Sequence, residues 1–309
     1  MAITAPRTMG DFAGFITPTQ AGPIFDDARR QSVIMQLVPQ MALGANGAVI
    51  TTTTSKPTAN WVGEGGQKPT SQGGKGLMPV AAKKLASIVV NSAEVVRADP
   101  GGYITGLYAD LAEAFATAFD LACLYAIGGD GTGSGPFTTA LADTTKEIYF
   151  GDADNAYLDV VAGLKLLVDD GRKLTGFAFG DVAEPVFLEA VDANKRPLFI
   201  DTPPTESALP ISLAQLRQGR MLGRPAFIGQ GVDNADVLGF AGDWRKARWG
   251  VVGGISYRVS TEGTVTIDGD LVSLFENNLV AILAEAEYGF AVADEENFVK
   301  FLSGDDSSS

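Results

Sequence analysis

Residues Asp99–Pro136, DPGGYITGLYADLAEAFATAFDLACLYAIGGDGTGSGP, hold the longest helical period in the sequence and decide its fold. Asp99 can cap a helix that begins at Pro100, where the missing N–H and the fixed φ of proline cost nothing. Apolar residues then recur at three- and four-residue steps with polar residues between them, which predicts one buried side and one solvent-facing side. The apolar side carries Ile104, Leu107, Tyr108, Leu111, Phe115, Phe119 and Ala122, and the polar side carries Asp110, Glu113, Thr117 and Asp120.

The helix is predicted to end in the glycine-rich run GGDGTGSGP. Gly128 and Gly129 can take the left-handed conformation that closes a helix, and Pro136 prevents its continuation. At about 1.5 Å per residue, the helix is roughly 40 Å long, too long for the inside of one compact core. We therefore expect a spine that joins two lobes. The run also resembles a phosphate-binding loop, but it ends a helix instead of opening one and lacks the Walker lysine, so no cofactor is predicted.

Two stretches rich in β-branched residues precede the spine, Ala48–Val62 and Leu85–Val96, and we predict that they pair as one long hairpin. Between them lies GEGGQKPTSQGGKGLMP, far longer than the roughly two to five residues of an ordinary hairpin loop. A ribbon of two strands is marginal by itself because it needs a further layer to bury its face. We expect that layer to be another subunit.

The segments after the spine alternate between helical and strand-like patterns. Asn155–Asp170 repeats the helical signature with Gly171 as its stop, and Leu174–Phe179 is a short apolar strand, which together indicate a second, compact α/β lobe. The last seventy residues are mostly strand-like, with Leu279–Val292 as the longest run, and this sheet is expected to pack against the spine. At the other end, residues 1–45 are expected to form an extended arm with one helix near Phe25–Gln36.

Composition excludes several classes of function. The formal charge is −14 because 37 acidic residues outnumber 23 basic ones, so specific binding of nucleic acid is not expected. The chain has no histidine, the commonest general base and metal ligand, and we predict no metal site and no catalytic triad. Cys123 is the single cysteine and is expected in the core. No run reaches the roughly 18 apolar residues of a membrane span, so no membrane partner is expected.

The order of these segments resembles the major capsid proteins of tailed bacteriophages, with the HK-ninety-seven-type fold. The resemblance covers nearly the whole chain and rests on six segments with compatible spacing. They are GEGGQKP, GGDGTGSGP, VFLEAVDANKRPLFI, MLGRPAFIG, GDWRKARWGVVGGISYRVST and FENNLVAILAEAEYGFAVADEENFVKFL. The resemblance implies an α+β fold with an N-terminal arm (1–45), an extended-loop β-hairpin (46–96), a peripheral domain with the long spine helix (97–127 and 240–290), an axial α/β domain (128–239 and 291–303) and a flexible tail (304–309).

The same resemblance implies a structural protein of the virion. Copies of the chain would assemble in the host cytoplasm into hexamers and pentamers of an icosahedral shell around the phage genome, touching DNA only non-specifically. Portal and decoration proteins are possible partners. Met1 stands near the start of the arm where some members carry a long scaffolding segment, so scaffolding is expected from a separate protein or not at all. The alternative is an encapsulin-type nanocompartment that encloses a cargo enzyme, whereas a soluble enzyme has no motif to support it.

In one crosslinking branch of that family, a lysine at the extended-loop tip forms an isopeptide bond with an asparagine of an adjacent subunit, assisted by a glutamate. By motif these positions match Lys68, Asn278 and Glu285, and Leu279, Ile282 and Leu283 would supply an apolar wall. Glu287 stands where that branch has an arginine, and uncrosslinked members are more common, so non-covalent contacts are favoured. The expected intersubunit residues of the tip are Gly63, Glu64, Lys68, Pro69 and Lys75.

Overall fold

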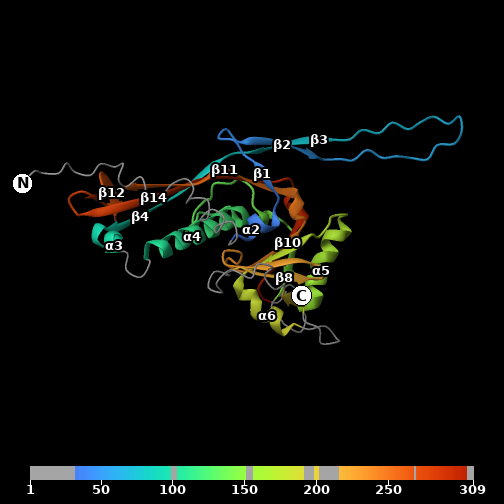
Figure 1. Ribbon diagram of the computed structural model, residues 1–309. Helices are drawn as coiled ribbons and strands as arrows, with labels where there is room; N and C mark the ends of the chain where they lie inside the picture. The colour runs from blue at the N-terminus through green and yellow to red at the C-terminus, as the bar shows by residue number, and fades with distance from the viewer. Residues whose placement is uncertain are drawn as a thin grey trace, which may run out of the picture.

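A long central sheet carries the spine helix on one side, a compact second lobe below and a hairpin that projects away from the body (Figure 1). The structure is a computed structural model, and it describes residues 32–98, 103–150, 156–190, 198–201, 216–267 and 269–304. Residues 1–31, Asp99, Pro100 and most of the C-terminal tail are therefore outside the described part of the chain. No helix within that part is long and apolar enough to cross a membrane.

The central sheet has four strands in the order β1-β11-β14-β4. β11 (Ala247–Ser260) and β14 (Leu279–Val292) pair antiparallel along most of their length, and β4 (Lys83–Ser92) continues the sheet beside β14. β1 (Gln40–Ala42) adds a short parallel edge to β11. At the far end stand α3 (Ala93–Ala98) and a small hairpin of β12 (Thr264–Ile267) and β13 (Asp270–Ser273).

The spine is α4 (Tyr103–Tyr125), and the expected apolar side faces this sheet. Leu111, Phe115 and Phe119 are at most 4% exposed, and the ring of Phe119 lies 5.0 Å from that of Tyr288 on β14 and 6.0 Å from that of Trp249 on β11. The packing of the C-terminal sheet against the spine is thus confirmed.

The end of the spine differs in detail from the prediction. The residues with positive φ are Ala126 (52°), Gly131 (77°) and Gly133 (69°), not Gly128 and Gly129. The loop closes on itself instead, because the backbone N–H of Gly135 donates to the carbonyl of Ala126 at 2.7 Å. The glycines therefore serve a compact closing loop rather than a single helix cap.

The second lobe is built on a seven-stranded sheet in the order β5-β15-β10-β6-β9-β8-β7. The strands are β5 (Glu147–Tyr149), β6 (Gly176–Phe179), β7 (Phe199–Asp201), β8 (Arg217–Met221), β9 (Arg224–Ile228), β10 (Val237–Gly242) and β15 (Phe298–Leu302). Helices α5 (Ala156–Asp169) and α6 (Glu184–Glu189) accompany it, and Gly171 follows α5 with φ of 69°, the predicted stop. Short 3-10 turns span Leu141–Asp143, Asp181–Ala183, Trp244–Lys246 and Glu295–Asn297.

The core of this lobe is aromatic. The ring of Phe179 lies 4.5 Å from that of Phe187, 5.2 Å from that of Phe301 and 6.0 Å from that of Phe150, and all four side chains are at most 1% exposed. Interlocked rings of this kind define a rigid lobe with its own core.

The predicted pairing of the hairpin is wrong in its second strand. β2 (Ala48–Thr53) pairs with β3 (Lys75–Val80), whereas the stretch beginning at Leu85 forms β4 and pairs with β14. The reason is burial, since Leu85 and Val89 on one face of β4 pack into the core under the spine. A long strand with one apolar face gains more from a central sheet than from an exposed ribbon.

The described part of the expected arm is also not extended. Helix α2 (Val33–Leu37) lies beside the spine, and Val33, Ile34 and Met35 are at most 4% exposed (Figure 1). The indole N–H of Trp249 donates to the carbonyl of Val38 at 2.9 Å. Residues 33–38 are therefore part of the main core, because their apolar side chains pack into it.

Candidate assembly surfaces

The most exposed segment of the molecule is the extension of the β2–β3 hairpin. The last bonds between its two arms join the N–H of Thr54 to the carbonyl of Gly74 at 3.1 Å and the N–H of Gly74 to Ser55. Beyond them the chain runs out to a turn in which the N–H of Gly66 donates to the carbonyl of Gly63 at 3.0 Å. The expected tip residues Gly63, Glu64, Lys68, Pro69 and Lys75 are all exposed.

Sequence reasoning missed the main apolar group of this extension. The side chain of Trp61 is fully exposed, at 104% of its reference area, although a tryptophan is one of the largest apolar surfaces that a residue can offer. Val62 beside it is 41% exposed. An apolar pair on a projecting ribbon is typical of a surface that another chain covers.

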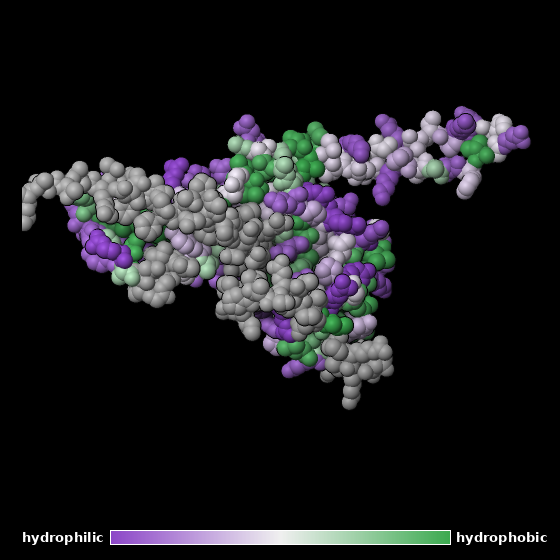
Figure 2. Space-filling model, in the orientation of Figure 1, coloured by the Kyte–Doolittle hydropathy of each residue, from purple (hydrophilic) through white to green (hydrophobic). Residues whose placement is uncertain are grey.

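The base of the hairpin is held to the body by a small core of its own. Met78 and Val80 of β3 are buried against Leu43 and Ala291. The opposite face is open, and Val49 and Leu77 there are 64% and 72% exposed. Figure 2 shows hydrophobic side chains gathered over this base and mostly hydrophilic ones along the extension. The hairpin is anchored at one end and leaves its length available for contact.

The far end of the central sheet offers a second surface. Ile88, Val90, Val265, Ile267 and Leu279 line an open groove between β4 and the β12–β13 hairpin. Nearby, Leu271 and Phe275 are 78% and 79% exposed. The exposed charges at this end are Glu94, Arg97, Arg258, Glu262, Asp270 and Glu276, so acidic groups predominate.

The three crosslink candidates do not meet within one chain. Asn278 has a left-handed backbone with φ of 53°, and its side-chain amide donates to the carboxylate of Glu94, a contact that the sequence did not suggest. Glu285 instead pairs with Lys84, whose Nζ lies 3.2 Å from its carboxylate. Asn278 and Glu285 are seven positions apart along an extended chain, which corresponds to about 23 Å. Lys68 lies on the hairpin extension.

Only part of the expected apolar wall lies on the face of β14 that carries Glu285. Successive strand residues point to opposite sides, so Leu279 and Leu283 share the face of Glu285, while Ile282, at 2% exposed, turns to the other. Glu285 therefore lies beside a cation on a half-exposed face and not in a closed apolar site.

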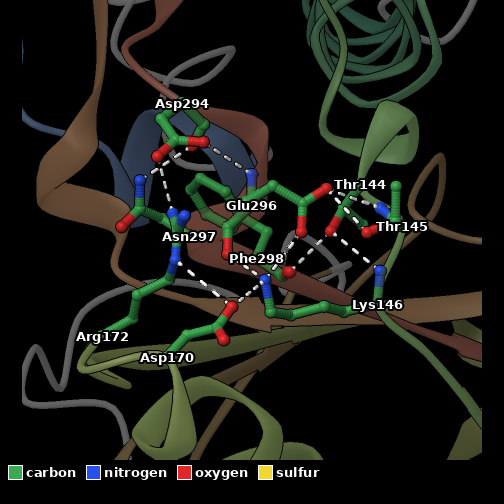
Figure 3. A network of polar contacts seen from close by, with 9 residues as sticks. All are labelled: Thr144, Thr145, Lys146, Asp170, Arg172, Asp294, Glu296, Asn297 and Phe298. Atoms are coloured by element: carbon green, nitrogen blue, oxygen red, sulfur yellow. Dashed lines mark hydrogen bonds and ion pairs between the residues drawn. The ribbon is translucent and has the colours of Figure 1, made fainter.

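A polar network, drawn in Figure 3, joins the second lobe to the end of β14. The Nζ of Lys146 lies 2.7 Å from the carboxylates of both Asp170 and Glu296, and its side chain is only 10% exposed. The ion pair with Lys146 and hydrogen bonds from Thr145 lower the pKa of Glu296 to about 2. Beside it, Arg172 donates to Asp294 at 2.7 Å. These contacts hold the β14–β15 connection, by which the chain enters the second lobe, against the end of α5 and the segment before β5.

The similarity to known proteins extends over nearly the whole chain. The model of the phage capsid family matches residues 13–302. The probable major capsid protein gp17 of Mycobacterium phage L5 is 38% identical over 307 residues, which cover 95% of this chain and 91% of that protein. Its counterpart in Mycobacterium phage D29 is also 38% identical, covering 93% and 90%.

Solved structures share the fold at lower identity. A chain from Gordonia phage Cozz superposes with a TM-score of 0.68 at 21% identity, covering 89% of this chain and 87% of that one. A chain from Mycobacterium phage Ogopogo superposes with a TM-score of 0.66 at 20% identity, covering 89% and 92%.

Proposed function

This chain belongs to the phage capsid family, and we propose that its copies form the hexamers and pentamers of an icosahedral shell around a phage genome. It is a major capsid protein that forms the shell of a tailed phage, and so a structural part of the virion. The proposal that copies of the chain assemble in this way rests on the projecting hairpin, which buries only its base within its own chain. A ribbon of two strands gains its missing layer from a neighbour in a closed assembly.

The neighbour's contribution follows from charge and shape. The hairpin and its extension carry Lys56, Lys68 and Lys75 against the single acid Glu64, in a chain whose net charge is −14. The far end of the central sheet carries the acidic groups and the open apolar groove. We infer that the tip of one copy, with Trp61 as its apolar contact, lies over that end of an adjacent copy. Opposite charges would set the register of this contact.

We propose that this contact is non-covalent. Asn278 is already bonded to Glu94, and Glu285 is already paired with Lys84, so neither group is free to serve an incoming lysine without rearrangement. Denaturing electrophoresis of mature particles tests this directly. A single band near 32.2 kDa supports non-covalent contacts, whereas a ladder of multiples that Lys68→Ala abolishes would establish a crosslink.

The two lobes are proposed to take separate places in the capsomer. The seven-stranded lobe would be the axial domain, meeting its copies at the capsomer centre, and the spine with the central sheet would be the peripheral domain. The hydrophobic core that the second lobe has to itself on one face of its sheet supports this division, although the other face of that sheet packs in the core shared with the spine. Assembly in the host cytoplasm and contacts with portal and decoration proteins belong to the same proposal. The acidic chain would enclose DNA without holding its phosphates.

Electron microscopy of the purified chain tests the assembly proposal. Closed icosahedra or hexameric capsomers are expected, and dispersed monomers under all assembly conditions would overturn it.

Trp61→Ala separates the hairpin contact from folding, because a fully exposed side chain adds nothing to the stability of the free subunit. We expect unchanged unfolding of the free chain but fewer or less stable particles. Equal particle yield and stability would remove Trp61 from the interface.

A further inference from the structure

One acidic residue of the spine is buried where the helical period predicts a solvent-facing position. The side chain of Asp120 is 1% exposed, and its carboxylate accepts three hydrogen bonds from the start of helix α2. Ser32 Oγ donates at 2.6 Å, and the backbone N–H groups of Val33 and Ile34 donate at 2.8 and 3.3 Å. Ser32 Oγ in turn accepts from the N–H of Met35 at 3.1 Å, so the whole first turn of α2 depends on this carboxylate.

No cation balances the charge among the described residues around Asp120. The side chains packed about it belong to the main core, and those of α2, VIMQL, include no ionisable group. On the spine itself, the ionisable neighbour is the thiol of Cys123, whose pKa is raised by burial and by the carboxylate, so that the thiol stays neutral. Burial raises the pKa of Asp120 to about 7, against the lowering effect of its three hydrogen bonds.

We propose that Asp120 and Ser32 form a proton-dependent anchor, which holds helix α2 against the spine and tightens as the pH falls. The geometry explains the dependence. The ionised carboxylate is buried with hydrogen bonds alone to replace water, whereas the protonated carboxyl has no charge to desolvate and can itself donate to Ser32 Oγ. Figure 1 shows α2 lying beside the spine, where this anchor joins two segments 88 residues apart in the sequence.

The direction of the pH dependence of docking follows from the difference in the pKa of Asp120 between the docked and undocked forms. In the docked form the pKa of Asp120 is about 7, and in the undocked form it returns toward its usual value of 3.8, so docking takes up a proton between those limits. The proton comes from solvent. Docking is strongest below about pH 4, weakens by up to about tenfold per pH unit as the pH rises, and levels off above about pH 7.

Hydrogen exchange of the Val33 and Ile34 amides in the unassembled full chain measures docking, after correction for the intrinsic effect of pH on exchange. We expect protection to fall at least tenfold between pH 5 and pH 8. Asp120→Asn should flatten that dependence, because an amide does not titrate. The matched control Asp110→Asn, an exposed acid on the same helix, should leave the dependence unchanged.

A second variant keeps the proposal testable if Asp120→Asn does not fold. Ser32→Ala removes one donor and retains the carboxyl, so protection should be lower and the pH midpoint should move upward as the ionised form loses a hydrogen bond. Protection that is independent of pH from 5 to 8 in the natural chain would overturn the anchor. So would an equal slope in Asp120→Asn, or a midpoint unmoved by Ser32→Ala.

Discussion

Replacing Lys146 with methionine should destabilise the junction between the second lobe and the β14–β15 connection by about 2 kcal/mol. The lysine Nζ bonds to the carboxylates of Asp170 and Glu296 at 2.7 Å and to the carbonyl of Glu296 at 2.9 Å. Methionine keeps the buried stem of the side chain, so the change removes the ammonium and little packing.

The expected loss in the free energy of unfolding lies between the values for buried and for exposed charged contacts. Hydrogen bonds to charged groups contribute about 1.5–3 kcal/mol each when buried, and exposed ion pairs contribute about 0–1 kcal/mol. Lys146 is nearly buried, but the side chains of Asp170 and Glu296 are 50% and 31% exposed and regain water when the lysine is lost. The free energy of unfolding should therefore fall by about 2 kcal/mol, between these limits.

Urea unfolding of the unassembled chain measures this change. Trp244 reports on the same junction, since its ring lies 5.2 Å from that of Phe298, whose carbonyl accepts a hydrogen bond from Thr144 in the network. Lys173→Met is the matched control because Lys173 is exposed on the connection after α5, and its effect should stay within about 0.5 kcal/mol. Equal effects of the two variants would refute the reasoning. So would strict additivity of Lys146→Met and Glu296→Gln, since a real contact gives a coupling energy.

Further outcomes are expected for the Lys146–Glu296 pair at low pH, for the phenylalanine cluster and for two glycines. Below pH 4.5 the contribution of Glu296 should disappear progressively, because its pKa is lowered to about 2, and the stability gap between the natural chain and Lys146→Met should narrow by pH 2 in the same urea assay. Phe179→Ala should cost about 3–5 kcal/mol by opening a cavity among four rings, measured by loss of thermal stability. Gly239→Ala should destabilise the fold, because the new Cβ would lie 2.5 Å from the carbonyl oxygen of Ala178, whereas Gly106→Ala meets nothing within 4 Å and should stabilise the spine by up to about 1 kcal/mol in the same measurement.

The spine could be predicted because its signal is local. Apolar residues at helical spacing lie on one side of α4 whatever the partner is, and Leu111, Phe115 and Phe119 pack as expected. The burial of Asp120 could not be predicted in this way. A polar residue on the far side of a helix is normally in water, but α2 covers this side, and its backbone donors replace the solvent. No local pattern indicates which distant segment will cover a helix.

For the candidate sites too, local features could be predicted from the sequence, whereas contacts with distant segments could not. Gly63, Glu64, Lys68, Pro69 and Lys75 are exposed, as expected for a glycine-rich run with few apolar side chains, and their role in contacts between subunits stays a prediction. Spacing along the chain could not show that Asn278 bonds to Glu94 or that Glu285 bonds to Lys84, because the partners in both contacts are far apart in the sequence. The exposure of Trp61 was likewise not predicted, since a tryptophan in a strand-like run normally indicates core.

By itself the sequence determined the periodic elements: the spine, the helix before Gly171, the strands of the C-terminal region and the long polar loop. Helical and strand periods depend on the residues of one segment, so they can be recognised without knowing which other segments pack against it. Only the tertiary structure decided that β4 leaves the ribbon for the central sheet and that α2 belongs to the core. The physical reason is that strand pairing and burial are choices among competing partners, and the free energy of each choice depends on apolar surface that distant parts of the chain supply.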